Sequence, residues 1–229
     1  MSVLHDPELE GLLAALHARS DEQLKAMRSH REERTKEPPL SADEEAARAK
    51  AFVSDKLVAL DRDKAEFCYQ LCRATNARRI VEIGTSYGVS TLYLAAALRD
   101  NVRAGGGSGV VIGTEYEPGK AKAARTHFAQ AGLDPFIELR EGDLRETLKT
   151  LEGPIDFMLV DIWIGMSRPA LELVAPHLRP GAIVVCDNTR TYRDAYADYL
   201  AFINDPANGF RTMTLPFEGG LELSVRCPV

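Results

Sequence analysis

The chain has 229 residues and a formal net charge of -6 at neutral pH, with no dense basic run. This acidic balance argues against a general surface for nucleic acids or anionic membranes, so we expect a small molecule as the partner. No apolar stretch approaches the ~20 residues that a membrane span needs, and the acidic start of the chain lacks a signal-peptide pattern. We therefore expect a cytoplasmic protein, long enough for one α/β domain and a helical extension.

The cysteines and histidines do not suggest a metal site. The four cysteines and five histidines are scattered without metal-binding spacing. We interpret the cysteines as reduced thiols and the histidines as surface or half-buried side chains.

The beginning of the chain is predicted to be helical. Leucines at helical spacing and a capping box at Ser41–Glu44 indicate three helices, over residues 7–31, 41–60 and 61–77, with a break at Pro38-Pro39. We divide the chain into an N-terminal helical extension, residues 1–60, and a main domain, residues 61–229. The extension could cover an active site, form a dimer face or complete the core.

Residues 78–98 combine a strand, a glycine turn and the start of a helix. The apolar strand Ile80–Ile83 suits the centre of a parallel sheet, and Gly84 and Gly88 give a turn that a ligand can approach. Free N–H groups at the helix start favour an anionic group, to which Ser90 could add a hydroxyl donor. A strand, turn and helix without any ligand is the alternative.

The glycine spacing separates two candidate cofactors. Ser86 stands where the dinucleotide fingerprint has its second glycine, so NAD or FAD loses support. Glu82 precedes Gly84, and the resulting E-x-G-x-x-x-G turn resembles motif I of the S-adenosylmethionine (SAM) dependent methyltransferases. The resemblance implies that Glu82, Gly84 and Gly88 lie at the methionine end of SAM.

The next two strands carry candidate ligands for the rest of the cofactor. Glu115 ends a strand predicted over residues 110–114, where a carboxylate can accept both ribose hydroxyls. Tyr116 could lie against the adenine ring, or be a half-exposed side chain on a loop. Asp143 follows a strand over residues 136–140 and could bind the adenine amino group, cap the helix over residues 144–151, or do both.

Two further strands end in side chains that carry oxygen ligands. The apolar segments of residues 155–163 and 181–188 bring Asp161, Asp187 and Asn188 to the carboxyl edge of the sheet, where ligands bind. An all-oxygen set of this kind suits Mg²⁺, or alternatively Mn²⁺ or Ca²⁺, with the remaining positions open. Aspartates that only cap loops are the alternative interpretation.

The segments of residues 160–163 and 186–189 resemble those of the cation-dependent O-methyltransferases, the family of catechol and caffeoyl-CoA O-methyltransferases. The resemblance covers about residues 60–229 and implies that Asp161, Asp187 and Asn188 hold the metal. One residue departs from the family pattern, because Ile164 stands where the family usually has a lysine that acts as general base. No general base is therefore assigned.

The remaining connections complete the predicted fold. We expect a loop over residues 101–109, helices over residues 118–131 and 191–203, and a C-terminal hairpin of residues 210–216 and 221–226. The fold class is α/β: a Rossmann-like, seven-stranded, mostly parallel sheet with a C-terminal antiparallel hairpin, helices on both faces and the N-terminal helical extension.

The predicted function is SAM-dependent, metal-assisted O-methylation of a small aromatic or enolic hydroxyl, in a homodimer as in many relatives. Asp161 acts through the metal, and Asp161 and Ile162 also border the cofactor. Ile162 and Trp163 supply an apolar wall, although Trp163 could equally belong to the core. Two alternatives remain: a metal-independent N-, C- or O-methyltransferase, and a SAM-binding protein without catalytic turnover.

Overall fold

The computed structural model describes residues 3–34 and 40–228, so the predicted break at Pro38-Pro39 lies outside the described residues. The chain divides into two compact units, residues 1–59 and residues 60–229. No helix of the described ranges is long and apolar enough to cross a membrane.

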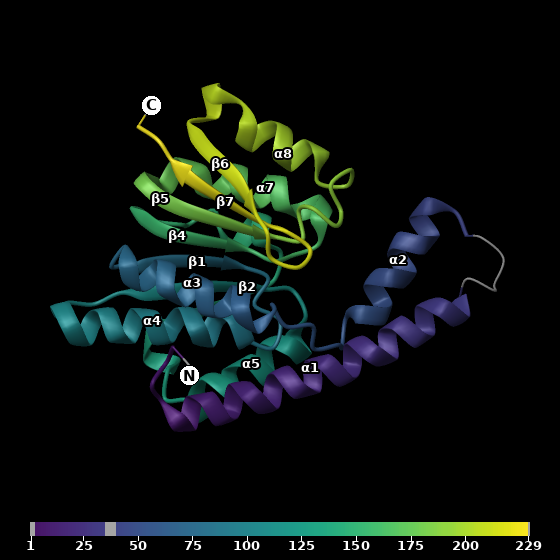
Figure 1. Cartoon of the computed structure of the whole chain (residues 1–229), viewed down its shortest axis with the longest axis horizontal. Helices are drawn as coiled ribbons and strands as arrows, with labels where there is room; N and C mark the ends of the chain where they lie inside the picture. Colours follow the sequence, from purple (N-terminus) through teal and green to yellow (C-terminus); the bar gives the residue numbers. More distant parts are fainter. Residues whose placement is uncertain (1–2, 35–39, 229) are drawn as a thin grey trace. The chain divides into compact units, whose positions relative to one another are not determined.

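The first unit contains α1 (Pro7–Arg34) and α2 (Ala42–Val53), drawn in purple and blue in Figure 1. The predicted capping box is present at the start of α2, where the Glu44 N–H donates to Ser41 Oγ at 3.3 Å. The helix ends at Val53, earlier than predicted, because the Ser54 hydroxyl binds the Ala51 carbonyl at 2.7 Å. The chain beyond it then bonds back to α1 instead of continuing the helix, with the Leu57 N–H on Gln23 Oε1 at 2.6 Å.

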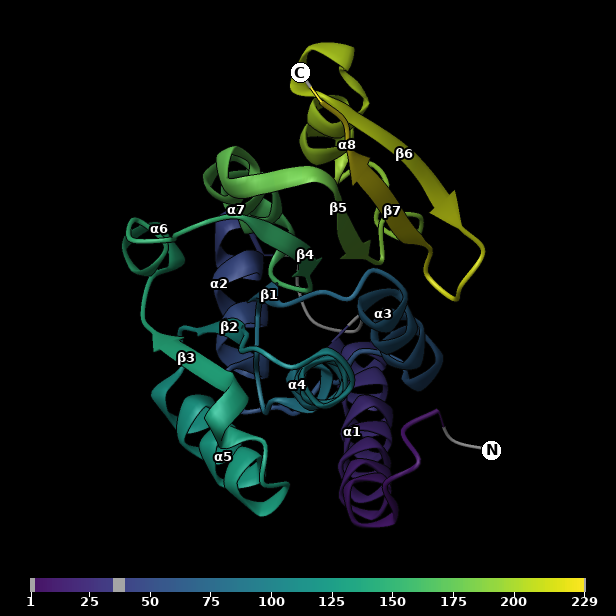
Figure 2. The same ribbon diagram turned by 90° about the vertical axis from the view of Figure 1, so that its left-hand side faces the viewer.

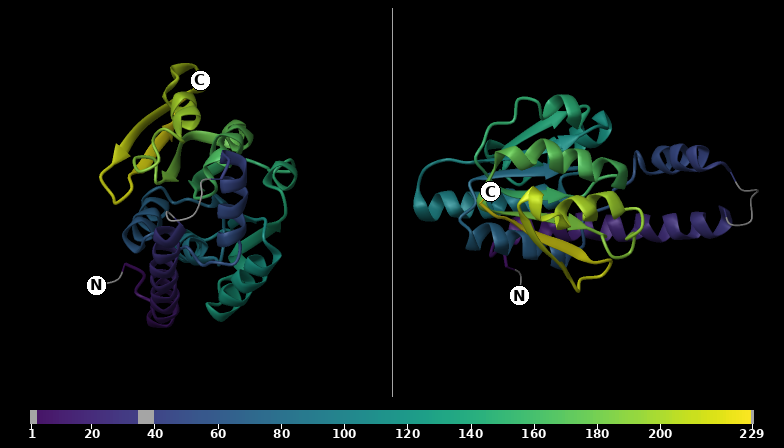
Figure 3. Two further views of the ribbon diagram at one scale, coloured as in Figure 1. Left: turned by 90° about the vertical axis from the view of Figure 1, so that its right-hand side faces the viewer. Right: turned by 90° about the horizontal axis from the view of Figure 1, so that it is seen from above.

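The second unit is built on a seven-stranded sheet in the order β3-β2-β1-β4-β5-β7-β6. The first five strands pair in parallel, and β7 pairs antiparallel with both β5 and β6. Figures 2 and 3 show β3 at one edge of the sheet and the β6–β7 hairpin at the other. The predicted fold class is therefore confirmed. The strand bounds are β1 (Arg79–Ile83), β2 (Val110–Glu115), β3 (Ile137–Glu141), β4 (Ile155–Val160), β5 (Leu178–Asp187), β6 (Phe210–Leu215) and β7 (Leu221–Arg226).

Helices cover both faces of this sheet (Figure 2). The central strands are apolar on both sides: Val81 and Val160 belong to the core under α6, α7 and α8, while Ile80 is fully buried on the other face. Such continuous apolar runs are what a doubly covered parallel sheet requires. The helix bounds are α3 (Arg62–Ala74), α4 (Val89–Gly105), α5 (Pro118–Gln130), α6 (Leu144–Thr147), α7 (Ile164–Val174) and α8 (Ala197–Asn204), with short 3₁₀ turns at Asp134–Phe136, Ala175–His177 and Pro206–Asn208.

The predicted helix over residues 144–151 ends early, at Thr147, and two further predicted boundaries in this unit are wrong for tertiary reasons. The predicted loop over residues 101–109 begins inside α4, because the buried Asn101 amide donates to the carbonyls of Cys72 and Ala77 and holds the helix in place. The predicted helix over residues 191–203 begins later, at Ala197, because the Arg190 and Thr191 N–H groups donate to the Gly219 carbonyl.

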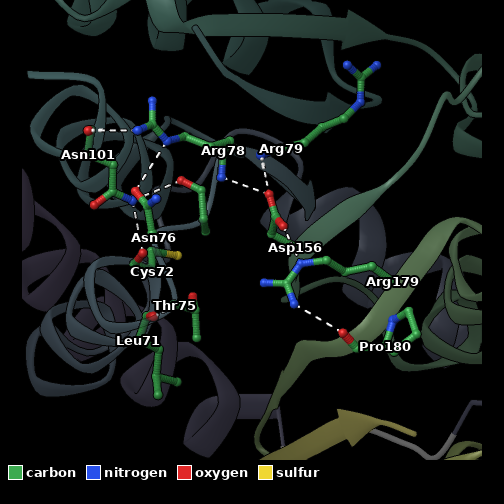
Figure 4. A network of polar contacts seen from close by, with 11 residues as sticks. Leu71, Cys72, Thr75, Asn76, Arg78, Arg79, Asn101, Asp156, Arg179 and Pro180 are labelled. Carbon is green, nitrogen blue, oxygen red and sulfur yellow. Dashed lines mark hydrogen bonds and ion pairs between the residues drawn. The ribbon is translucent and has the colours of Figure 1, made fainter. Parts of the chain in front are cut away.

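A polar network ties the amino ends of the strands together, opposite the edge where ligands are expected (Figure 4). Asp156 is the second residue of β4 and accepts hydrogen bonds from the N–H groups of Arg78 and Arg79, at 2.8 and 2.9 Å, and from Arg179 Nε at 2.5 Å. Burial raises the pKa of Asp156, but the bonds from Arg179 and the two N–H groups outweigh it, so the pKa is lowered. One carboxylate therefore joins β1, β4 and β5.

We expect Asp156→Asn to lower the free energy of unfolding by about 1–3 kcal/mol, because it removes a charged acceptor from partly buried donors. The native pKa is lowered, so this stabilisation is present above the unfolded-state pKa and is lost as the pH falls through the native one. Urea unfolding at neutral pH should separate the variant from the wild type, and the gap should narrow in acid. Glu152→Gln, at the exposed Arg79 ion pair, is the control and should change stability by less than about 0.5 kcal/mol.

Candidate functional site

The site lies at the carboxyl ends of β1, β2, β4 and β5, where the predicted residues converge. The turn after β1 touches the end of β4, since the Asp161 N–H donates to the Ile83 carbonyl at 3.0 Å. A Cβ on Gly84, whose φ is 97°, would lie 2.0 Å from the Asp161 carbonyl oxygen. Gly84 is therefore required by this contact as well as by its left-handed backbone.

Gly88 has a different role from the one that a ligand-facing turn suggests. Its φ is 83°, and a Cβ would lie 2.4 Å from the Phe128 ring in α5. The residue lets α5 pack closely under the first turn of α4. Its contact with the cofactor stays a prediction.

Glu82 holds the turn from inside the protein. Its side chain is fully buried, and Oε2 accepts the hydroxyl of Thr85 at 2.9 Å and that of Thr91. Ser90, in the first turn of α4, also hydrogen bonds to Glu82. Burial raises the pKa of Glu82, while these hydroxyls oppose the shift. Both residues shape the turn, and their contacts with a cofactor stay predictions.

Glu115 brings the second strand to the same turn. Its carboxylate accepts the N–H of Ser86 through Oε2 and the N–H of Glu117 through Oε1, both at 2.7 Å. Ser86 has a φ of 50°, which only a few non-glycine residues adopt. Because both of its oxygens are held by the backbone, the nearly buried Glu115 carboxylate has one fixed orientation.

The two candidate adenine ligands differ in their surroundings. Tyr116 is 60% exposed, as its loop interpretation predicts. Asp143 is the N-cap of α6, with its carboxylate accepting the Arg145 N–H at 2.9 Å. The Arg145 guanidinium binds the same carboxylate and lowers the pKa of Asp143 to about 2. The capping role is confirmed, and adenine binding stays a prediction for both residues.

A buried cluster of charges occupies the ends of β4 and β5. Asp187 is 5% exposed, and its Oδ1 lies 2.8 Å from Nζ of Lys64. Lys64 is 1% exposed and makes a second ion pair, at 2.7 Å, with Asp61 Oδ2. Although burial lowers the pKa of Lys64, its hydrogen bonds to Asp187 and Asp61 outweigh that effect and raise it. Lys64 therefore stays charged.

Asp161 lacks such a partner. No side chain or backbone N–H within residues 3–34 and 40–228 donates a hydrogen bond to its carboxylate. Burial, together with the nearby Asp187 and Glu82, raises its pKa to about 8. A half-buried carboxylate without a donor is stabilised by a cation.

Asn188 is held beside Asp187 by the C-terminal hairpin. It has a φ of 60°, and its Nδ2 donates to Asp187 Oδ2 at 2.7 Å. A Cβ on Gly219, in the β6–β7 turn, would lie 2.5 Å from Asn188 Oδ1. The hairpin turn therefore fixes the third predicted oxygen ligand.

The donor set fits a divalent cation. In the described ranges, no three His, Cys, Asp or Glu side chains lie close enough together to hold a metal ion. The predicted set is of another kind, because its third ligand is an asparagine. Lys64 shares its single positive charge between Asp61 and Asp187, so the carboxylates of Asp61, Asp161 and Asp187 together are only partly compensated. Two carboxylates and an amide oxygen match the ligands that Mg²⁺ prefers.

The sequence analysis missed Lys64 and Asp61. The available signal was a lysine on the apolar face of α3, where Ala65, Cys68 and Cys72 are also buried. Ile164, which stands where the family usually has a lysine, is the first residue of α7 and packs partly buried against the core. Trp163 is 46% exposed, so the interpretation of it as a core residue is wrong. Ile162 is partly buried against the same core.

The chain is similar in sequence to known methyltransferases. Residues 81–189 match the model of a methyltransferase domain family. A catechol O-methyltransferase of Mycobacterium tuberculosis is 32% identical over 154 residues, which cover 65% of this chain and 67% of the relative. A catechol O-methyltransferase of Niastella koreensis is 28% identical over 135 residues, 57% of this chain and 58% of the relative. The chain thus spans about two thirds of the first relative and less of the second.

Solved structures agree on the fold. An O-methyltransferase from Bacillus cereus in complex with SAH has a TM-score of 0.65 at 23% identity, over 82% of this chain and 92% of that one. The O-methyltransferase TomG from Streptomyces achromogenes in complex with SAM has a TM-score of 0.62 at 24% identity, over 83% of this chain and 92% of that one.

The contact between Gly84 and Asp161 predicts a large effect of a small substitution. We expect Gly84→Ala to destabilise the protein by more than about 1 kcal/mol, because the methyl group meets a backbone carbonyl and φ is positive. Gly165→Ala in α7 is the control, since a Cβ there meets nothing within 4 Å and alanine favours a helix. Thermal unfolding of both variants measures the difference, and equal melting temperatures would contradict the prediction.

Proposed function

Because the chain belongs to the family of SAM-dependent O-methyltransferases, we propose that its acceptor is a small aromatic or enolic molecule and that a divalent cation assists the transfer. The observation that carries the proposal is the pair formed by the half-buried Asp161 and the buried Asp187, of which Asp161 has no side-chain donor within the described ranges. The two relatives that are catechol O-methyltransferases support an aromatic acceptor with neighbouring oxygens. Mg²⁺ is the proposed ion.

The proposed cofactor site follows the edge of the sheet. Glu115 has a fixed carboxylate at the end of β2, suited to accept the ribose hydroxyls. The turn from Gly84 to Gly88 leads directly into α4, and the first N–H groups of that helix suit the carboxylate at the methionine end of SAM. Tyr116 and Asp143 are proposed for the adenine, and Ile162, with Asp161, for the wall beside the cofactor.

Asp161, Asp187 and Asn188 would hold the cation. A bound divalent cation supplies charge that lowers the pKa of an acceptor hydroxyl. The protein's own contribution is orientation: Asp187 is fixed by Lys64, and Asn188 by the hairpin turn. The exposed Trp163, two residues after Asp161, offers an apolar surface for an aromatic acceptor.

A metal-independent methyltransferase on the same fold is the second candidate. The ammonium group of Lys64 already compensates Asp187, which favours this candidate, since Asp161 and Asp187 could then orient the acceptor directly. Membership of an enzyme family sets aside the third possibility, a SAM-binding protein without turnover.

Isothermal titration separates the two catalytic candidates. Chelator-stripped protein should bind S-adenosylhomocysteine, and should then bind Mg²⁺ and, only with the ion, a catechol such as caffeate. Asp187→Asn should keep cofactor binding but weaken Mg²⁺ by more than the roughly 10–100-fold that changes around a metal's ligands cost. Asp134→Asn is the control, because Asp134 is exposed and lies in the 3₁₀ turn before β3, at the amino end of that strand. Cofactor binding without any response to Mg²⁺ would favour the metal-independent candidate.

Glu115 tests the cofactor site alone. We expect Glu115→Gln to weaken S-adenosylhomocysteine binding by about 10–100-fold, because a charged acceptor is lost and an N–H is left unpaired. Glu117→Gln retains the backbone N–H that Glu115 accepts, so it should bind the cofactor as the wild type does. Equal affinities of the two variants would remove Glu115 from the proposed site.

A further inference from the structure

Lys64 is a buried ammonium group shared by two carboxylates. Its Nζ lies 2.8 Å from Asp187 Oδ1 and 2.7 Å from Asp61 Oδ2. The Lys64 and Asp187 side chains are 1% and 6% exposed, whereas the Asp61 side chain is 50% exposed. The inner ion pair is therefore shielded from water, and the outer one is open to it.

The helix that carries Lys64 is held against the site. Asp61 is the N-cap residue of α3 but makes no side-chain capping bond, and its carboxylate is paired with Lys64 instead. One turn further along α3, the Phe67 ring packs 5.3 Å from the Phe217 ring of the hairpin tip. The ammonium group consequently has little freedom to leave Asp187.

Lys64 places a positive charge beside a proposed metal ligand, whereas the first turn of α7 carries none. Ile164 occupies the first position of that helix, so the chain places no lysine there. Lys64 forms an ion pair with a proposed metal ligand, Asp187. Its charge therefore acts directly on the Asp187 carboxylate.

We propose that Lys64 is a resident cation that competes with the divalent ion for Asp187 and thereby limits how tightly the ion binds. This inference rests on the proposed metal-assisted function. A positive charge beside a ligand repels the incoming ion and draws electron density from the ligand oxygen. Asp61 moderates that repulsion by sharing the ammonium group.

The proposal predicts opposite effects for two neighbouring substitutions. Lys64→Met removes the charge but keeps an unbranched side chain, and it should tighten Mn²⁺ binding by about tenfold or more. Asp61→Asn leaves the whole Lys64 charge to Asp187 and should weaken Mn²⁺ binding severalfold. If Lys64 and Asp61 only maintained the shape of the site, both substitutions would weaken Mn²⁺ binding. Lys64→Arg preserves the charge and should stay within a few-fold of the wild type.

The test is a titration of the full chain with Mn²⁺, with free ion followed by electron paramagnetic resonance, at saturating S-adenosylhomocysteine and constant salt. Calorimetric titration with S-adenosylhomocysteine reports whether each variant retains its cofactor site. Tighter binding by Lys64→Met and weaker binding by Asp61→Asn are expected. Shifts in the same direction, or no shift, would overturn the inference.

The outcomes also distinguish this inference from the function it rests on. If the wild type binds Mn²⁺ but Lys64→Met is no tighter, only the inference fails. If both bind the cofactor and neither binds Mn²⁺, the metal-assisted function fails with it. If Lys64→Met does not fold, Asp61→Asn decides, because the Asp61 side chain is half exposed. Unchanged Mn²⁺ affinity of Asp61→Asn would then overturn the inference.

Discussion

Buried negative charge at the carboxyl edge of the sheet is the constraint on which the rest of the site depends. Burying a carboxylate is costly unless donors or cations satisfy it. Glu82 Oε2 accepts the hydroxyls of Thr85 and Thr91, the Glu115 carboxylate accepts two backbone N–H groups, and Asp187 pairs with Lys64 and Asn188. Each set of donors fixes a piece of backbone: the glycine turn, the end of β2, and the loop after β5. Asp161 alone among these carboxylates has no donor, and it is also the residue whose backbone contacts Gly84.

Most of the fold could be predicted because its signals are local. The apolar strands, the glycine turn and the hairpin each lie within a few residues, and their order along the chain is enough to place the acidic strand ends at one edge. The incorrect boundaries have causes distant in sequence. Residues 101–105 are helical because Asn101 bonds to Cys72 in α3 and to Ala77 after it, and residues 190–191 are not helical because they bond to Gly219.

The part of the candidate site that directly follows the strands could be predicted from local sequence signals. Glu115 and Asp161 directly follow strands, so periodicity locates them, whereas Lys64 precedes the sheet in the chain and meets Asp187 only after folding. Hydropathy also argues against finding a lysine inside, since lysine is rarely buried without a partner. A lysine on the apolar side of an amphipathic helix is therefore informative, because its burial requires an acidic partner elsewhere in the chain.

The contact between the β6–β7 turn and the loop after β5 has a consequence for how the protein can diverge. The Gly219 carbonyl accepts two N–H groups of that loop, and a Cβ on Gly220 would lie 2.5 Å from the Cβ of Arg190. A lengthened or side-chain-bearing hairpin turn would push directly on the segment that carries Asn188. Insertions in the loop after β5 should therefore be tolerated only when the hairpin tip changes with them, so the two segments are expected to vary together.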